Sequence, residues 1–289
     1  MLYETAEDWL AASEKRVLLF GMSGLGKTHI SQRLRATGRW FHYSVDYRIG
    51  SRYLDEAIAD NAKREAMAVP FLRELLMTDS IRVTANLTFG NLAAVSSWLG
   101  KPGDPAKGGL AVAEYQARQA RFREAEIAAL HDTAHFATRA ESLYGYPNFI
   151  CDSGGSICEW VAPEDPDDPI LAELEATCLL VWIEGTPEHE AELIRRFDAA
   201  PKPMAYQPAF LAEVWALYLA ETGKAPEAVD PDAFIRFAYA RALAHRQPRY
   251  AAMARRGVTI SAEEAAGVAD EESFNHVIAA ALERRAAAA

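Results

Sequence analysis

The stretch RVLLFGMSGLGKTHIS, residues Arg16–Ser31, decides the fold. Apolar residues 17–20 lead into a glycine-rich turn that closes on Lys27 and Thr28. A short apolar run of this kind is typical of a strand buried in a parallel sheet. Residues 29–35 have the pattern of a helix start, so the turn joins a strand to a helix.

The turn itself fits the pattern G-x-x-x-x-G-K-[ST], a phosphate-binding loop or P-loop. Its glycines let backbone N–H groups point at a phosphate, and the following helix N-terminus adds partial positive charge. We expect Lys27, as an exposed loop residue, to reach the terminal phosphates, and the Thr28 hydroxyl to hold Mg²⁺. The residues expected to contact the nucleotide are Ser23, Gly24, Leu25, Gly26, Lys27, Thr28 and His29.

Composition narrows the class of protein. The chain has 289 residues, enough for one domain with an insertion or for two domains. Its formal net charge of −11 argues against a nucleic-acid or anionic-membrane partner. The three cysteines show no C-x-x-C spacing, which indicates a reducing compartment without a zinc site. The apolar run 178–183 is too short to span a bilayer, and residues 1–10 lack the apolar core of a signal peptide. We therefore expect a cytoplasmic protein.

Strand and helix patterns alternate along the chain. Further strands are expected near 40–46, 148–152, 178–185 and 257–261. This alternation predicts an α/β fold with a doubly wound parallel sheet. Residues 1–50 and 147–289 form the predicted core, and 51–146 a large helical insertion, with a loop at 100–109.

In such sheets, ligands bind at the carboxyl ends of the strands. The predicted second strand ends in Asp46, with Arg48 just beyond it. The third ends in Asp152, followed by Gly154 and Gly155. The fourth leads into a helix that carries Arg195 and Arg196. The strand ends therefore carry chemically useful side chains, as the rule requires of an active site.

These motifs, in this order, resemble the shikimate-kinase-like members of the small-molecule P-loop kinases. The resemblance implies that Asp46 handles an acceptor hydroxyl, that Arg48 grips an acceptor carboxylate, and that the glycines 154 and 155 also meet the acceptor. It further implies that LIRRF (193–197) supplies the paired arginines and that KPM (202–204) stands in the place of the lid motif. The sequence RQPRY supplies Arg246, Pro248 and Tyr250 of the last long helix, and Arg246 is expected to face the acceptor together with Arg48. GVTIS follows as the adenine-contacting strand.

The resemblance covers residues of about 16–50, 147–205 and 236–282, and it implies ATP and Mg²⁺ as cofactors. Phosphoryl transfer then depends on positioning and charge neutralisation. Lys27, Asp46, Arg195, Arg196 and Lys202 are the expected catalytic residues, and Thr28 and Asp152 the metal-side residues. Lys202 stands where the family has a lid arginine, the third glycine of the acceptor turn is missing, and the insertion is longer than in the family. These departures argue against shikimate as the acceptor.

Several features have a plainer interpretation beside the functional one. Asp46 and Asp152 are common residue types at turns and helix caps, and the paired arginines suit a solvated helix face. His131 and His135 share a helix face at metal-binding spacing, but the Glu of H-E-x-x-H is absent. The sequence DSGG fits a GTPase turn, but no N-K-x-D guanine motif occurs. Arg118, Arg121 and Arg123 suit either a pocket for an acidic substrate or a solvated surface.

We predict an ATP- and Mg²⁺-dependent kinase for a hydroxyl of a small anionic metabolite. The alternative is a nucleotide-dependent switch or adaptor ATPase whose insertion binds a protein partner. A long insertion is rarely idle in a compact domain. We expect residues 51–146 to form a wall of the acceptor cleft or, instead, to dock a partner or a second copy of the chain. The loop 100–109 is expected to be dispensable in either case.

Overall fold

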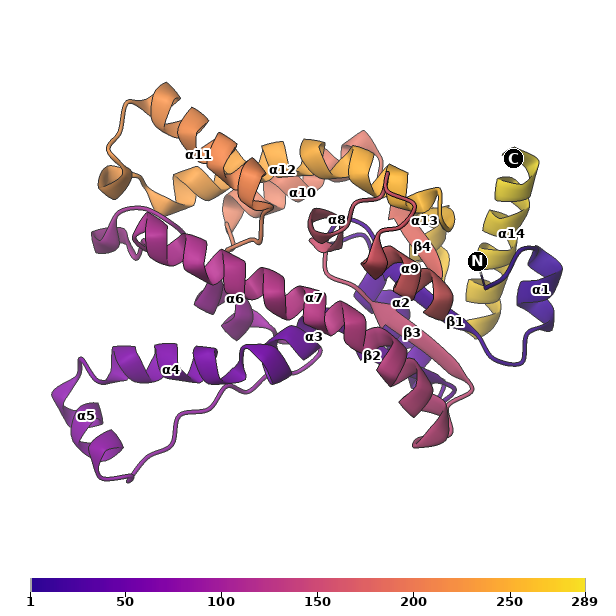
Figure 1. The fold of residues 1–289 in the computed structure, drawn as a ribbon, viewed down its shortest axis with the longest axis horizontal. Helices are drawn as coiled ribbons and strands as arrows, with labels where there is room; N and C mark the ends of the chain where they lie inside the picture. The colour runs from indigo at the N-terminus through magenta and orange to yellow at the C-terminus, as the bar shows by residue number, and fades with distance from the viewer. Residues whose placement is uncertain (1, 289) are drawn as a thin grey trace. The chain divides into compact units, whose positions relative to one another are not determined.

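A five-stranded, all-parallel sheet is the centre of the fold in the computed structural model, which describes residues 2–288 (Figure 1). The strand order is β2-β3-β1-β4-β5. The strands β1, β3 and β4 are buried almost throughout, as expected for a parallel sheet covered on both faces. The doubly wound α/β fold is confirmed. The strands are β1 (Arg16–Phe20), β2 (Trp40–Ser44), β3 (Asn148–Asp152), β4 (Leu179–Glu184) and β5 (Val258–Ser261).

The chain divides into two compact units. The first comprises Met1–Val45, Ile127–Ala200 and Ala238–Ala289, and it contains the whole sheet. The second comprises Asp46–Glu126 and Pro201–Phe237. The second unit therefore includes a segment after residue 200 that the predicted insertion 51–146 does not, and the helix α7 (Val112–Ser142) contributes to both units.

Helices enclose the sheet of the first unit. The C-terminal parts of α7, from Ile127 on, and of α12 (Pro231–Ala254), from Ala238 on, belong to it. The shorter and terminal helices of this unit are α1 (Ala6–Ala11), α2 (Lys27–Ala36), α8 (Ile157–Trp160), α9 (Pro169–Thr177), α10 (Pro187–Ala199), α13 (Ala262–Gly267) and α14 (Glu271–Ala288).

The two terminal helices α1 and α14 pack side by side (Figure 1). Trp9 of α1 is fully buried, and its indole N–H donates to the carbonyl of Asn275 at 3.2 Å. Phe274 meets Trp9 and Trp40 edge to face, with ring centroids 6.3 and 5.6 Å apart. Burial of an aromatic residue contributes on the order of 2–3 kcal/mol, so this cluster fixes α1 against α14 and α14 against β2.

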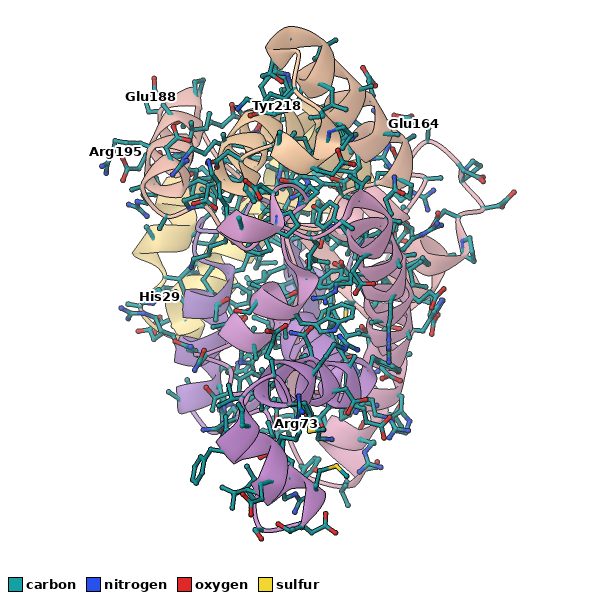
Figure 2. The ribbon with its side chains drawn as sticks, turned by 90° about the vertical axis from the view of Figure 1, so that its left-hand side faces the viewer. His29, Arg73, Glu164, Glu188, Arg195 and Tyr218 are labelled. Carbon is teal, nitrogen blue, oxygen red and sulfur yellow. The ribbon has the colours of Figure 1, made fainter. Side chains whose placement is uncertain are left out.

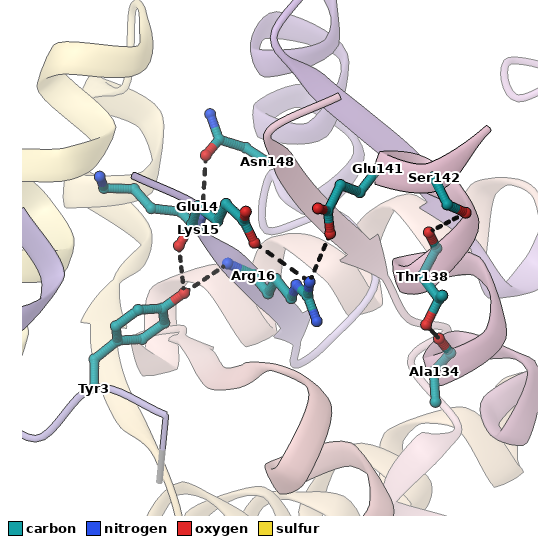
Figure 3. A network of polar contacts seen from close by, with 9 residues as sticks. All are labelled: Tyr3, Glu14, Lys15, Arg16, Ala134, Thr138, Glu141, Ser142 and Asn148. Carbon is teal, nitrogen blue, oxygen red and sulfur yellow. Dashed lines mark hydrogen bonds and ion pairs between the residues drawn. The ribbon is translucent and has the colours of Figure 1, made fainter. Parts of the chain in front are cut away.

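Polar contacts fix the entry to β1, on the side away from the P-loop (Figure 3). The hydroxyl of Tyr3 donates to the carbonyl of Glu14 and accepts from the N–H of Arg16. The N–H of Lys15 donates to Asn148 at the start of β3, at 2.9 Å. These bonds align β1 with β3, which sets the register of the strand that carries the P-loop.

The second unit is mainly helical, as predicted for residues 51–146. Its elements are α3 (Val45–Arg48, from Asp46 on), η1 (Ile49–Tyr53), α4 (Asp55–Ala66), α5 (Pro70–Met77), α6 (Ala93–Leu99), η2 (Pro105–Lys107), the N-terminal parts of α7 and α12, α11 (Pro208–Thr222) and η3 (Pro226–Ala228). Residues 81–89, between α5 and α6, form an extended segment whose side chains alternate between half-buried and exposed. This segment follows a period of two, and the helical interpretation of the region missed it.

Two local expectations need correction. The strand β2 ends at Ser44, so Asp46 lies in the first turn of the short helix α3 rather than at a strand end. The loop 100–109 is tied down, because the N–H of Asp104 donates to the carbonyl of Val229 and the ammonium of Lys101 pairs with Asp232 at 2.5 Å. A Cβ on Gly103 would come within 2.4 Å of the Val229 carbonyl. The loop is thus part of the packing of the second unit, and its deletion is expected to disturb that unit.

Candidate nucleotide-binding site

The P-loop follows β1, which lies between β3 and β4 in the sheet. Gly24 and Gly26 have φ values of +94° and +100°, a backbone region that side chains rarely adopt. Gly26 is the N-cap of the ten-residue helix α2. The first N–H groups of that helix have no partner within the helix, so the loop and the helix together form an anion-binding terminus.

Lys27 is buried rather than exposed, which corrects the expectation from sequence. Only 6% of the residue is accessible, and its ammonium donates to the carbonyls of Gly21 and Met22 at 2.8 and 2.9 Å. These bonds fold the side chain back over its own loop. Thr28 and His29 are exposed in the next positions, and Figure 2 shows His29 at the surface.

Asp152 lies at the end of β3, opposite Leu19 of β1 in the strand register. Its carboxylate is buried, and Oδ2 is 3.7 Å from Nε2 of His42 on the neighbouring strand β2. The Ser153 hydroxyl donates to the carbonyl of Leu19 at 2.8 Å. The end of β3 is therefore bonded to the strand that enters the P-loop, which puts a carboxylate at the same sheet edge.

The predicted metal-side residues Thr28 and Asp152 carry oxygen donors, the type of ligand that Mg²⁺ prefers. Among residues 2–288, no group of three or more His, Cys, Asp or Glu side chains could hold a metal ion. Mg²⁺ keeps several waters and is usually bound by one or two side chains together with substrate phosphates. Thr28 and Asp152 match that requirement, and their assignment to the metal remains a prediction.

The turn after β3 packs against the P-loop. A Cβ on Gly155 would lie 2.8 Å from the Ser23 hydroxyl oxygen and 3.4 Å from the Ser23 nitrogen. The Tyr250 hydroxyl donates to the Gly155 carbonyl. Glycine at 155 thus lets two loops approach closely. The acceptor contact that the resemblance implies for Gly154 and Gly155 remains a prediction.

Arg246 on α12 is buried and already has a carboxylate partner. Its Nε donates to Oε1 of Glu159 on α8 at 2.6 Å, and the exposed fractions of the two side chains are 3% and 0%. Burial opposes the charge of Arg246, but Glu159 beside it raises the pKa of the guanidinium above its ordinary value. His245 Nε2 lies 3.6 Å from the other Glu159 oxygen. Arg246 remains a predicted acceptor residue, with its charge balanced by Glu159.

The rest of the RQPRY segment also bonds to α8, to the residue that follows α8, and to α10. The guanidinium of Arg249 donates to the carbonyls of Cys158 and Val161 at 2.7 and 2.8 Å. The amide of Gln247 donates to Glu190 and lies 3.7 Å from the Met22 sulfur in the P-loop. Sequence reasoning missed Glu159 and Gln247. An acid within the apolar run ICEWV was the available signal for Glu159, since a buried carboxylate needs a partner.

The buried thiols and phenol near this segment are kept neutral. Burial raises the pKa of the Cys158 thiol to about 12 and the pKa of the Tyr250 hydroxyl well above its usual value. Burial likewise raises the pKa of Cys151. Among the described residues, all three cysteines are buried and free of disulfides, so they serve as packing groups.

Arg195 and Arg196 lie on the exposed face of α10, where both pair with Glu192 at 2.7 and 2.6 Å. Figure 2 shows the Arg195 side chain pointing outward from the helix. The hydrogen bonds from Arg195 and Arg196 lower the pKa of the Glu192 carboxyl to about 2. In this arrangement the two arginines form part of a solvated helix face, and their lid role remains a prediction.

The other predicted acceptor and lid residues belong to the second unit. Asp46 is in α3, and the Arg48 guanidinium lies 5.6 Å from the ring centroid of Tyr53, a cation–π distance. Lys202 is exposed in the segment that precedes α11. The P-loop, Asp152, Gly154, Gly155 and Arg246 belong to the first unit.

The paired histidines do not form a metal site within the part of the chain that the structure describes. His131 instead bonds to Glu173 of α9 through Nδ1 at 2.5 Å. His135 meets the ring of Phe136 edge to face. Both contacts are those of a helix packed at a protein surface. No helix in residues 2–288 is long and apolar enough to cross a bilayer.

Comparisons with known proteins give one kind of match. No protein-family profile and no curated protein matches the chain. A search of solved structures finds a shikimate kinase from Bacteroides thetaiotaomicron that is 18% identical, with 93% of this chain and 95% of that chain covered and a TM-score of 0.38. The assignment of an α/β P-loop fold follows from the parallel sheet and the loop of this chain itself.

Proposed function

We propose that the chain is an ATP- and Mg²⁺-dependent phosphotransferase that acts on a hydroxyl of a small molecule. The observation that carries the proposal is the P-loop at the end of β1, with positive φ at Gly24 and Gly26 and with Asp152 in register beside β1. This backbone and this pair of strand ends suit a nucleoside triphosphate with a magnesium ion.

The residues of the loop would divide the work on the nucleotide. When bound, Mg²⁺ would neutralise charge on the phosphates. Lys27 would exchange the carbonyls of Gly21 and Met22 for phosphate oxygens, a rotation of a flexible side chain within the loop. Thr28, exposed in the first turn of α2, would hold the metal, and Asp152 would order its waters. The loop N–H groups would bind the phosphates and fix their direction.

On the acceptor side we assign Asp46 as the group that orients or deprotonates the hydroxyl. Arg48 and Arg246 would both face an anionic acceptor, and Arg48 would supply most of the uncompensated positive charge, since the charge of Arg246 is already balanced by Glu159. Gly154 and Gly155 would contact the acceptor, and Arg195, Arg196 and Lys202 would cover the transferring group. For the two arginines this requires release from Glu192.

ADP formation tests the proposal when it is measured with ATP, Mg²⁺ and a library of hydroxylated metabolites, with product phosphorylation followed by ³¹P NMR. We expect turnover that depends on one class of added acceptor and that stops with EDTA or in Lys27→Ala. Transfer at the wild-type rate in Lys27→Ala would show that the P-loop assignment is wrong.

One observation is the starting point for testing the alternative, a nucleotide-dependent switch that binds a protein. The amphipathic helix α5 has no buried residue, and Phe71 and Met77 are 69% and 72% exposed. Exposed apolar side chains of this size often mark an interaction surface. Two results together would favour the switch over the kinase. ATP hydrolysis would not be stimulated by any added metabolite, and a partner protein that binds the wild type would not bind Phe71→Ser.

A further inference from the structure

A pocket of about 230 Å³ lies within the second unit. Its walls come from three helices. Asp60 and Arg64 lie on α4, Trp98 lies on α6, and Arg118 and Arg121 lie on α7. The spacings of four on α4 and of three on α7 place each pair on one helix face. Three guanidinium groups from two helices therefore border one small hollow.

Arg118 lines the pocket and is held in place by three hydrogen bonds. The residue is 9% exposed, and its Nε and Nη2 donate to Glu114 and Asn61 at 2.8 and 2.9 Å. Its Nη1 donates to the Trp98 carbonyl, and the guanidinium lies 5.8 Å from the Trp98 ring centroid. A guanidinium has five N–H groups, so two remain after these three bonds.

Arg64 and Arg121 differ from Arg118 in their partners. Both are exposed, and among residues 2–288 neither has a hydrogen bond or an ion pair. The acids of the pocket are already matched: Asp60 pairs with Lys63 at 3.1 Å, and Glu114 pairs with Arg118. The hollow thus carries excess positive charge in a chain whose formal net charge is −11.

We propose that this pocket binds a small organic anion through Arg64 and Arg121. A planar guanidinium matches a carboxylate or a phosphate with two parallel hydrogen bonds, and Arg is the residue type best suited to both. The Trp98 side supplies an apolar wall for a short carbon chain. Ligand pockets for drug-sized molecules measure about 300–1,000 Å³, so this smaller volume suits an anion of a few carbons. The site is independent of the P-loop and does not rest on the proposed kinase function.

Isothermal titration at constant ionic strength with two probes, malonate and inorganic phosphate, tests the proposal. It is done in the Lys27→Ala background, so that phosphate binding at the P-loop is weakened. We expect at least one probe to bind, with Kd raised ~10-fold or more in Arg64→Gln and in Arg121→Gln, since each loses a charged hydrogen-bonding pair. The probe that binds identifies the carboxylate or the phosphate as the preferred group.

Arg123→Gln is the matched control, because Arg123 is an exposed arginine on the same helix but outside the pocket. Its Kd should equal that of the parent protein, and circular dichroism should be unchanged in all three variants. The proposal is overturned if neither probe binds, if the double variant Arg64→Gln/Arg121→Gln binds as the parent does, or if Arg123→Gln weakens binding equally. Binding seen only when Lys27 is present assigns the anion to the P-loop and also overturns the proposal.

Discussion

The carboxylate of Glu159 and the guanidinium of Arg246 form a buried ion pair at 2.6 Å, although the two residues are 87 positions apart in the chain. The pair joins α8, which follows β3, to the long helix α12. Two charges in a buried place are stable only while both are present, because a lone buried charge keeps its desolvation cost without compensation.

Removal of one partner should therefore destabilise the fold strongly. We expect Arg246→Met and Glu159→Leu each to lower the free energy of unfolding by about 3–5 kcal/mol, and the double variant to lose much less than the sum. Urea denaturation followed by circular dichroism measures all three. An exposed ion pair contributes about 1 kcal/mol or less. If each single variant lost no more than that in free energy of unfolding, the result would contradict a buried pair.

Lys27→Ala should stay folded but should not be neutral for stability. The ammonium makes two hydrogen bonds to loop carbonyls, so we expect a loss of about 1–3 kcal/mol in the free energy of unfolding without nucleotide. Thermal unfolding with and without ATP and Mg²⁺ checks this. The wild type should gain stability from the nucleotide, and the variant should gain little.

Gly155→Ala should weaken nucleotide binding because the added methyl group would collide with Ser23 of the P-loop. The new Cβ would lie 2.8 Å from the Ser23 hydroxyl and would push on the P-loop. We expect KM for ATP to rise by about tenfold, which is ~1.4 kcal/mol. Gly267→Ala is the control, since nothing lies within 4 Å of a Cβ there. Equal KM values in the two variants would contradict the close approach.

Asp46→Asn tests the acceptor assignment. Loss of a general base should reduce kcat by roughly 10²-fold or more while the Kd for nucleotide changes little. Asp55→Asn, an exposed acid in the first turn of α4, should retain the wild-type rate. A variant that loses ATP affinity but transfers normally at saturation would instead make Asp46 a metal-side residue.

The Glu192 carboxyl should titrate near pH 2, because Arg195 and Arg196 hydrogen-bond to its ionised form. Its pKa is lower in the folded protein than in the unfolded chain, so its contribution to stability is present above pH 4.5 and is lost as the pH falls toward about 2. Carboxyl ¹³C NMR should show this midpoint, and Arg195→Gln or high salt should move it upward. A midpoint at the ordinary value would contradict the pairing.

Local patterns were sufficient for the sheet and the P-loop. The strands β1 and β4 are continuous apolar runs apart from one terminal residue each, and the G-x-x-x-x-G-K-T sequence fixes a strand–turn–helix within sixteen residues, Arg16–Ser31. The end of β2 was misplaced by two residues, because an aromatic run that continues into a helical turn has no breaker between them. The extended segment 81–89 was missed since its alternation lies between helical patterns.

The sequence by itself determined that this chain has a parallel α/β core and a glycine loop with the chemistry of a phosphate site, because those features depend on neighbours along the chain. Only the tertiary structure decided that Arg246 faces Glu159, that Gly155 faces Ser23 and that Lys27 is buried. The contacts at Arg246 and Gly155 join residues 87 or more positions apart, and the burial of Lys27 follows from how the folded loop closes over its side chain. No periodicity encodes such pairing, since it is set by how helices and loops pack around the sheet edge.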